Sequence, residues 1–239
     1  MSIVLNDLYD YDGMKIYQNN ESFKFSLDSI LLAEFVDLKK DSIKIVDFCT
    51  GNAPVPLILS TKSNASILGF EIQKSIYTLA IDSVKENKLE SRINIINDNF
   101  NNIRDYIDAE SIDVVTCNPP YFKYEKNSII NEDDNLAIAR HEITMNLEDI
   151  MINAKYVLKN KASLYIVHRP DRLEEIINSL SKYNFAIKKL QFIYSDINKK
   201  AIMVLIKATK NGKQGSLKIM PPVCIKDCKT YKGIFEKGD

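Results

Sequence analysis

Short apolar runs alternate with longer amphipathic stretches through most of the chain. Residues 43–48, 112–117 and 162–168 are apolar runs with the length and composition of strands buried on both faces. Between such runs, residues 74–87 place their apolar positions on one side of a helix, and Asn146 can cap a second helix. This alternation predicts an α/β fold, with a mostly parallel, doubly wound sheet and helices on both faces.

Four more apolar runs complete an expected sheet of seven strands, at residues 64–72, 93–96, 186–193 and 201–207. The last two are joined by a tight link, so we expect them to form an antiparallel C-terminal hairpin at the sheet edge. Asp171 is a candidate cap for a helix over residues 172–182. Residues 1–13 look irregular, whereas residues 14–18 suit a short strand.

We expect a single domain over residues 1–239, because no linker or composition shift divides the chain. Its expected parts are an N-terminal strand and helix extension at residues 1–40, a core at residues 41–207, and an irregular basic tail at residues 208–239.

Composition is that of an ordinary globular protein, with 45% hydrophobic and 27% charged residues. The sequence has no apolar run near the roughly 18 residues of a membrane span, and its first 13 residues do not resemble a signal peptide. The four cysteines are scattered and lack the spacing of a zinc site, which predicts reduced thiols. We therefore expect a cytoplasmic protein that binds neither membrane nor metal. The sequence leaves the oligomeric state open, with a monomer favoured over an oligomer.

The formal net charge is zero, but the charge is unevenly distributed. From Lys182 to the C-terminus the chain has 13 lysines against 4 acidic residues, and the preceding part carries the balancing acidic excess. This asymmetry favours a partner with a negative backbone, and Lys199 and Lys200 are candidates for phosphate contacts. A solvated lysine-rich surface is the alternative explanation.

A tight turn of small residues joins the strand at residues 43–48 to a helix that begins at Pro54. Asp47 lies in the strand, and Thr50, Gly51 and Asn52 form the turn, where backbone N–H groups can approach a ligand. The turn has one glycine, so it is neither the dinucleotide fingerprint nor a Walker A loop, and a pyrophosphate ligand is not expected.

Acidic residues follow the next two strands. Glu71 lies about 20 residues beyond the turn, where an acid can accept both ribose hydroxyls. Asp98 lies where an acid can accept an adenine amine. A helix cap or a solvated strand end would explain each carboxylate alone. Their succession at three strand ends, with Asn118 at the fourth, favours a ligand site.

The tetrapeptide Asn118-Pro119-Pro120-Tyr121 follows the fourth strand. Two prolines cannot continue a strand or a helix, and Pro119 keeps Asn118 out of the α region. The Asn118 amide therefore stands on a stiff turn at the edge where open α/β sheets bind ligands. A simple break between strand and loop would also explain the tetrapeptide if it stood alone.

Together these motifs resemble class I S-adenosylmethionine-dependent methyltransferases. The tetrapeptide resembles the signature of the branch that methylates adenine N6, guanine N2 or the glutamine side chain. With residues 25–33, 69–73 and 138–142, the chain resembles the bacterial tRNA1(Val) (adenine-37-N6)-methyltransferase family from about residue 20 to 207. Ala53 is a departure, because that family usually has glycine there.

The resemblance implies a Rossmann-like class I fold, S-adenosyl-L-methionine as cofactor and tRNA as partner. It implies a catalytic group formed by Asn118, Pro119, Pro120 and Tyr121, in which Asn118 and Pro119 accept the N–H groups of an exocyclic amine and Tyr121 and Phe122 stack on the flipped base. It implies that the cofactor contacts Ser26, Asp28, Asp47, Thr50, Gly51, Asn52, Glu71, Ile72, Asp98, Asn99 and Asn118. Arg140 and His141 would contact the tRNA, or else stabilise local structure.

Three other functions stay open. The acceptor of a methyltransferase can be guanine N2 in ribosomal RNA or glutamine N5 in a release factor. Release-factor enzymes normally have an additional N-terminal helical domain, and only about 40 residues precede Ile43, which counts against glutamine. A non-catalytic RNA-binding module with the same fold is the third, and the intact tetrapeptide argues against it.

Overall fold

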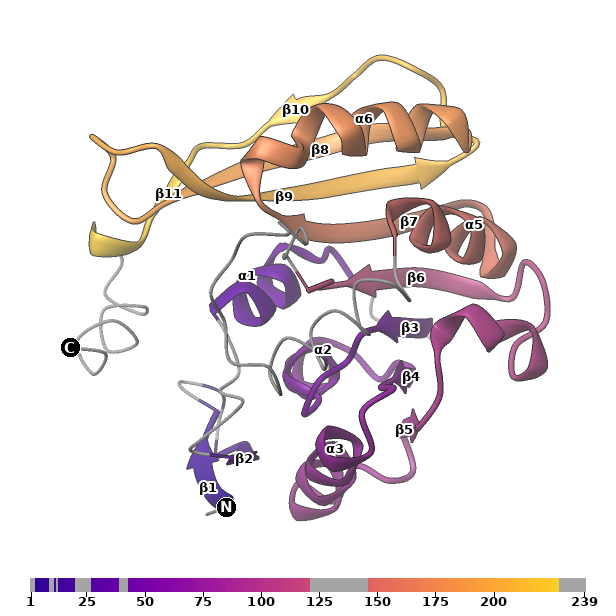
Figure 1. Cartoon of the computed structure of the whole chain (residues 1–239), viewed down its shortest axis with the longest axis vertical. Helices are drawn as coiled ribbons and strands as arrows, with labels where there is room; N and C mark the ends of the chain where they lie inside the picture. The colour runs from indigo at the N-terminus through magenta and orange to yellow at the C-terminus, as the bar shows by residue number, and fades with distance from the viewer. Residues whose placement is uncertain are drawn as a thin grey trace, which may run out of the picture.

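A mixed β-sheet of nine strands forms the centre of the described part of the chain (Figure 1). The computed structural model describes residues 3–8, 11, 13–19, 27–38, 43–120 and 146–227. The strand order is β10-β8-β9-β7-β6-β3-β4-β5, and β11 also pairs with β8. The strands of this sheet are β3 (Lys44–Phe48), β4 (Ser66–Phe70), β5 (Ile93–Ile96), β6 (Ile112–Cys117), β7 (Leu158–His168), β8 (Phe185–Tyr194), β9 (Ala201–Lys210), β10 (Lys218–Ile219) and β11 (Val223–Cys224).

The five strands from β3 to β7 are parallel, as predicted. The antiparallel pairing of β8 and β9 is confirmed, and β9 lies between β7 and β8. The expected number of seven strands is too low, because β10 and β11 cover the open edge of β8. The segment expected as an irregular tail thus contains two short strands, and β9 itself extends past residue 207. Runs of two residues carry no periodic signal in the sequence.

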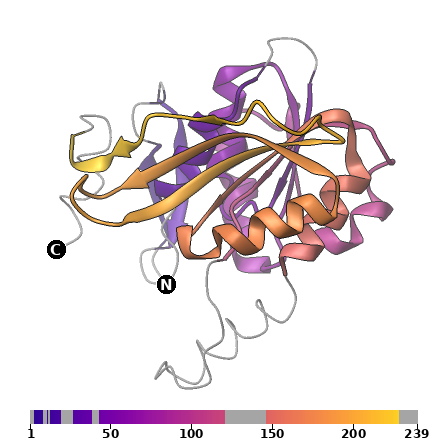
Figure 2. The same cartoon turned by 90° about the horizontal axis from the view of Figure 1, so that it is seen from above.

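Alternate residues of the parallel strands face two hydrophobic clusters, which confirms helices on both faces. Ile45 and Ile67 pack with α1 (Leu27–Phe35), α2 (Pro54–Lys62) and α3 (Lys74–Glu86). Val46 and Phe48 pack on the other face with α5 (Leu147–Val157) and α6 (Leu173–Lys182). Figure 2 shows α5 and α6 next to each other along one side of the twisted sheet.

The N-terminal segment forms a hairpin, whose second strand confirms the strand expected at residues 14–18 and whose first strand lies where an irregular stretch was expected. β1 (Ile3–Asp7) pairs antiparallel with β2 (Lys15–Asn19). Ile3 and Leu5 of β1 are exposed, so apolar side chains face solvent and the usual pattern of apolar-in, polar-out is absent. The hairpin packs on α3, whose Asn87 side chain accepts from the Lys15 N–H (2.9 Å) and donates to the Lys15 carbonyl (2.7 Å).

Of the two predicted helix caps, the cap of α5 is confirmed and the cap of α6 is wrong. Asn146 caps α5, since its Oδ1 accepts from the Asp149 N–H at 2.8 Å and the Asp149 carboxylate accepts from the Asn146 N–H at 3.2 Å. Asp171 does not cap α6, because its carboxylate pairs with Arg169 at 2.8 Å. The remaining short elements are the 3-10 helices η1 (Phe100–Asp105), η2 (Pro170–Arg172) and η3 (Ile225–Asp227).

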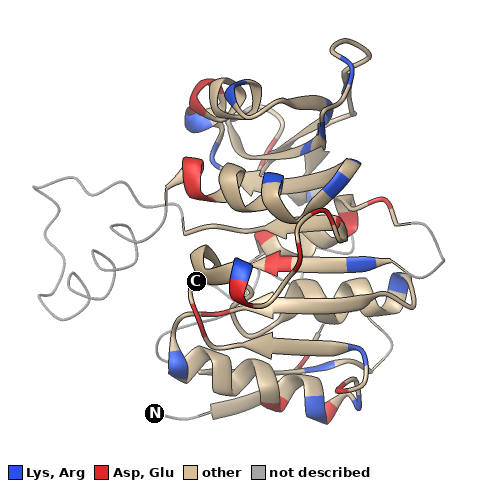
Figure 3. Ribbon diagram, turned by 90° about the vertical axis from the view of Figure 1, so that its right-hand side faces the viewer, with Lys and Arg blue, Asp and Glu red and all other residues tan. Residues whose placement is uncertain are grey.

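No described helix is long and apolar enough to cross a membrane. On the side of the molecule seen in Figure 3, acidic and basic residues are interspersed over helices and strand ends.

Candidate active site

Four of the predicted site residues lie at the carboxyl ends of four neighbouring parallel strands. Asp47 lies in β3, Glu71 follows β4, Asp98 follows β5 and Asn118 follows β6. These strands are adjacent in the order β6-β3-β4-β5, and Asp47 stands opposite Thr116 in the pairing of β3 with β6. The structure therefore brings the three acids and the amide to one edge of the sheet, as the sequence predicts.

The turn between β3 and α2 depends on left-handed backbone positions. The φ angle is positive at Cys49 (58°), Gly51 (58°) and Ala53 (74°). A left-handed conformation costs a residue with a Cβ about 1–2 kcal/mol, which explains why glycine suits position 53. The turn packs closely on β4, because a Cβ on Gly69 would lie only 2.8 Å from Thr50 Oγ1.

Asp47 is buried, and two threonine hydroxyls hold its carboxylate. Its Oδ1 accepts from Thr116 Oγ1 (2.5 Å) and its Oδ2 accepts from Thr50 Oγ1 (2.7 Å). Burial raises the pKa of Asp47 to about 7, although both hydroxyls act in the opposite direction. Asp47 thereby links the ligand turn to the strand that leads to Asn118.

The Glu71 carboxylate faces the same turn. Its Oε2 accepts from the Gly51 N–H (3.1 Å) and its Oε1 accepts from the Gln73 N–H (2.8 Å). Burial raises the pKa of Glu71, and these backbone N–H groups only partly offset that effect. Each carboxylate oxygen has a second lone pair, so Glu71 can also accept hydroxyl groups from a ligand.

Asp98 is only half-buried and is held by three donors. Its carboxylate accepts from the Tyr106 hydroxyl (2.8 Å), from Asn102 Nδ2 (3.0 Å) and from the N–H of Asn99 (2.7 Å). The Tyr106 hydroxyl lowers the pKa of Asp98, so the group is a carboxylate at neutral pH. Nothing in the spacing of the sequence indicates Tyr106 as a partner of Asp98. Ile72 is 40% exposed and offers an apolar surface after β4.

The side chain of Asn52 is completely buried, and its Nδ2 donates to the carbonyl of Tyr17 in β2 at 2.8 Å. Its Oδ1 has no hydrogen-bond partner among the described residues. An unpaired buried carbonyl costs about 1–3 kcal/mol, so a ligand with a donor group would stabilise this turn. This acceptor, with the carboxylates of Glu71 and Asp98, fits a ligand that carries amines and hydroxyls.

Asn118 lies beside the first turn of α1. Its Nδ2 donates to Ser29 Oγ at 3.0 Å, and Asp28 on the same helical turn is half-buried. Pro119 is buried and Pro120 is exposed, so the chain passes from the core to the surface between these two residues. The sequence interpretation missed both Ser29 and Thr116. The one feature of the sequence that could have indicated them is that each is a polar residue within an otherwise apolar segment.

Lys199 and Lys200 are exposed in the link between β8 and β9. The start of β9 pairs with the end of β7, with Val204 opposite His168, so this link projects from the same sheet edge as Asn118. Strands β7 and β9 separate the two lysines from β6, so they do not join the acids. The remaining predicted residues Ser26, Tyr121, Phe122, Arg140 and His141 lie outside the described residues.

Within the described ranges, no group of three or more His, Cys, Asp and Glu side chains is arranged to hold a metal ion. Cys49, Cys117 and Cys224 form no disulfide with one another in the part of the chain that the structure describes.

Proteins similar to this chain in sequence or in fold include methyltransferases. A curated tRNA1(Val) (adenine(37)-N6)-methyltransferase of Bacteroides thetaiotaomicron is 24% identical over 191 residues, which cover 79% of this chain and 78% of the relative. A predicted O-methyltransferase of Agrobacterium tumefaciens superimposes with a TM-score of 0.66 at 17% identity, over 88% of this chain and 94% of that one. No family model matches the chain.

A third likeness is to the geranyl diphosphate C-methyltransferase of Streptomyces coelicolor A3(2), which was crystallised with S-adenosyl-L-homocysteine. Its TM-score is 0.56 at 8% identity, over 76% of this chain and 78% of that one. These comparisons confirm the resemblance noted in the sequence, and they show that the chain has the class I methyltransferase fold.

Proposed function

We propose that this chain transfers a methyl group from S-adenosyl-L-methionine to the N6 atom of an adenine in tRNA, and that the adenine is residue 37 of tRNA1(Val). The observation that carries the proposal is the Asn118-Pro119 turn beside three strand-end acids at one edge of a methyltransferase sheet. The similarity to the Bacteroides enzyme over most of both chains supports this choice of acceptor.

Different residues of the site would bind different parts of the cofactor. Glu71 would accept hydrogen bonds from the ribose hydroxyls, and Asp98 would accept one from the adenine amine. The buried Oδ1 of Asn52 would accept from a donor at the amino-acid end of the cofactor. The turn that Asp47 and Thr50 hold would place backbone groups against the same end. When bound, the cofactor supplies a methyl group that its sulfonium has already activated.

The acceptor amine is a weak nucleophile because its lone pair is conjugated with the purine ring. The Oδ1 of Asn118 and the carbonyl of Pro119 would each accept one N–H bond, which turns the lone pair toward the methyl group. The same two oxygens would stabilise the positive charge that develops on nitrogen. We also propose that Tyr121 and Phe122 stack on the base and that Arg140 and His141 contact the flanking RNA.

The RNA would reach the site along the carboxyl edge of the sheet. Lys199 and Lys200 project from that edge and are exposed, so they can contact phosphates on the part of the RNA beyond the target base. We propose that the protein acts in the cytoplasm.

The test compares wild type, Asn118→Ala and the surface control Asn94→Ala on a tRNA1(Val) transcript with labelled cofactor. Loss of both hydrogen-bond acceptor and orientation predicts a rate at least about 100-fold lower for Asn118→Ala, with cofactor affinity retained in titration calorimetry. Asn94 is exposed in β5, at the opposite edge of the sheet from the β8–β9 link, and Asn94→Ala should match wild type.

Mass spectrometry of nucleosides identifies the acceptor. Total tRNA from cells without the gene should lose N6-methyladenosine at position 37. A fully active Asn118→Ala variant, or unchanged N6-methyladenosine in those cells, would overturn the proposal. The appearance of N2-methylguanosine in the reaction would move the acceptor to guanine.

A further inference from the structure

The Asn118 side chain is held by a residue outside the strand-end motifs. Ser29 lies in α1, its side chain is buried, and its Oγ accepts a hydrogen bond from Asn118 Nδ2 at 3.0 Å. These residues are 89 positions apart in the chain. We propose that Ser29 is a positioning residue that fixes the orientation of the Asn118 amide. The proposal rests on the proposed function, in which the oxygen of that amide meets the acceptor amine.

The chemistry of an amide makes its orientation important. A carboxamide has donors on nitrogen and an acceptor on oxygen, about 120° apart on the same carbon. While Nδ2 donates to Ser29, Oδ1 is the atom of this amide that can accept from an amine. If the amide were rotated by half a turn, an NH2 group would face the NH2 group of the adenine, and neither could accept from the other.

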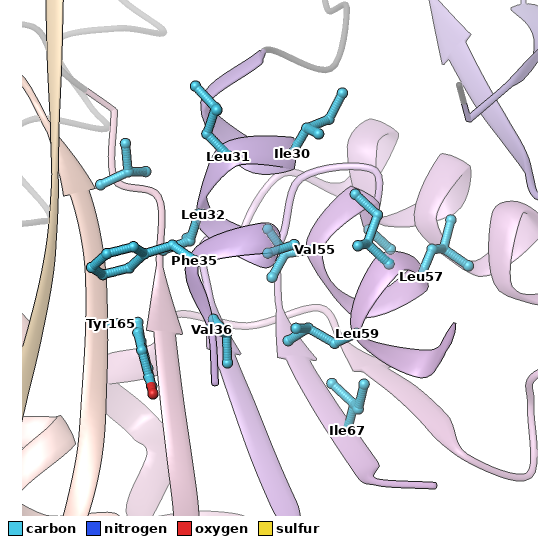
Figure 4. Packing of buried hydrophobic residues seen from close by; sticks show 14 of the residues in the cluster. Ile30, Leu31, Leu32, Phe35, Val36, Val55, Leu57, Leu59, Ile67 and Tyr165 are labelled. Atoms are coloured by element: carbon cyan, nitrogen blue, oxygen red, sulfur yellow. The ribbon is translucent and has the colours of Figure 1, made fainter. Parts of the chain in front are cut away.

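Ser29 is suited to this role because α1 is firmly anchored. Leu27, Ile30, Leu31 and Leu32 are buried in one hydrophobic cluster. Figure 4 shows the last three of them within this cluster. The Lys62 ammonium donates to the carbonyls of Ala33 (2.7 Å) and Glu34 (3.1 Å) near the end of the helix.

The end of α1 is tied to the sheet as well. Phe35 packs edge-on against Tyr165 of β7, with ring centroids 6.1 Å apart, and the Tyr165 hydroxyl accepts from the Asp37 N–H at 3.3 Å. Asp37 also forms ion pairs with Lys189 and Lys207 of β8 and β9 (both 3.2 Å). The anchored helix thus holds Ser29 Oγ in place beside Asn118, where it accepts from Nδ2.

A Ser29→Ala variant removes the acceptor, and Ser29→Thr restores a hydroxyl at the same position. The matched control is Ser60→Ala, which removes another helical serine that is equally buried (6% exposed for both). The Ser60 hydroxyl donates only within its own helix, to the Leu57 carbonyl at 2.7 Å. Each variant is assayed for kcat, for KM toward tRNA, for cofactor affinity and for thermal unfolding.

We expect Ser29→Ala to lower kcat about three- to tenfold, which corresponds to one hydrogen bond, with KM and cofactor affinity unchanged. Ser29→Thr should recover most of the lost kcat. Ser60→Ala should retain the wild-type kcat even if its melting temperature falls by as much as that of Ser29→Ala. A Ser29→Ala variant within twofold of the wild-type kcat, or a threonine variant no better than alanine, would overturn the proposal.

An NMR measurement keeps this proposal separate from the proposed function. The side-chain NH2 protons of Asn118 should exchange slowly with solvent in wild type and faster in Ser29→Ala, whatever the enzyme methylates. If wild type fails to methylate adenine while this difference persists, the proposed function fails and the positioning contact stands. If exchange is the same in both proteins, Ser29 does not hold the amide and the inference fails.

Discussion

The buried carboxyl group of Asp47 should make folding stability depend on pH. The unfolded chain has the ordinary pKa of 3.8 at this residue, and burial raises the folded value to about 7. The folded state therefore holds its proton over a pH range in which the unfolded state has released it. The contribution of Asp47 to the free energy of unfolding is highest below pH 4, falls as the pH rises toward 7, and is constant above pH 7.

The size of the effect follows from the two pKa values. The gap between 3.8 and about 7, at 1.36 kcal/mol for each pKa unit, corresponds to about 4 kcal/mol, of which about 3 kcal/mol falls between pH 5 and pH 8. In Asp47→Asn the side chain stays neutral at every pH. Its oxygen can accept from one threonine hydroxyl, and its NH2 group can donate to the other, so both contacts of Thr50 and Thr116 persist.

The assay is urea denaturation of wild type and Asp47→Asn at pH 5 and pH 8. We expect the free energy of unfolding of wild type to fall by about 3 kcal/mol more than that of the variant over this interval. Burial raises the pKa of Glu71 too, and the charge of Glu71 is one of the causes that raise the pKa of Asp47, so the difference between the two proteins includes this interaction. Asp108→Asn changes an exposed acid and serves as the control. Equal pH slopes for wild type and Asp47→Asn would refute the reasoning.

Three further predictions test the turn, a helix cap and the RNA-facing edge. Gly69→Ala should reduce stability by about 1–3 kcal/mol and weaken cofactor binding, because its Cβ would lie 2.8 Å from Thr50 Oγ1; unchanged calorimetry and melting would contradict this. Asn146→Ala should cost about 1 kcal/mol, or about 2–4 °C in melting temperature, through loss of the α5 cap, with activity retained. The double change Lys199→Glu and Lys200→Glu should weaken tRNA binding and reduce the slope of log affinity against log salt by about 1–2, without affecting cofactor affinity; an unaltered slope would place the RNA elsewhere.

The sequence predicts the site residues at the strand ends well. Their positions follow from the apolar runs in the sequence and from the parallel arrangement of the strands. A buried parallel strand gives a continuous apolar run, and its end is marked by the first polar residue, as at Glu71 and Asn118. Once such strands are parallel neighbours, their carboxyl ends must share an edge. The two-residue strands β10 and β11 have no such pattern, and the exposed apolar residues of β1 do not indicate which way the strand faces.

The partners of the site residues could not be predicted in the same way, because they depend on three-dimensional register. Thr116 meets Asp47 only because β3 and β6 pair with these residues opposite each other, although they are 69 positions apart. Ser29 meets Asn118 only because α1 packs against this end of the sheet. Tyr106 reaches Asp98 across the 3-10 helix η1, whose path the sequence does not define.

The sequence suggested that the N-terminal segment is an extension of a catalytic core. The structure shows that residues of this segment contact the site directly. The Tyr17 carbonyl of β2 accepts from Asn52 in the ligand turn, and the Tyr17 N–H donates to Ser83 of α3. α1 supplies the acceptor that holds Asn118. The turn and the amide therefore each depend on a residue before position 30. We propose that the N-terminal segment and the sheet form one domain, in which the N-terminal residues set the geometry of a site whose acids Asp47, Glu71 and Asp98 come from strand ends.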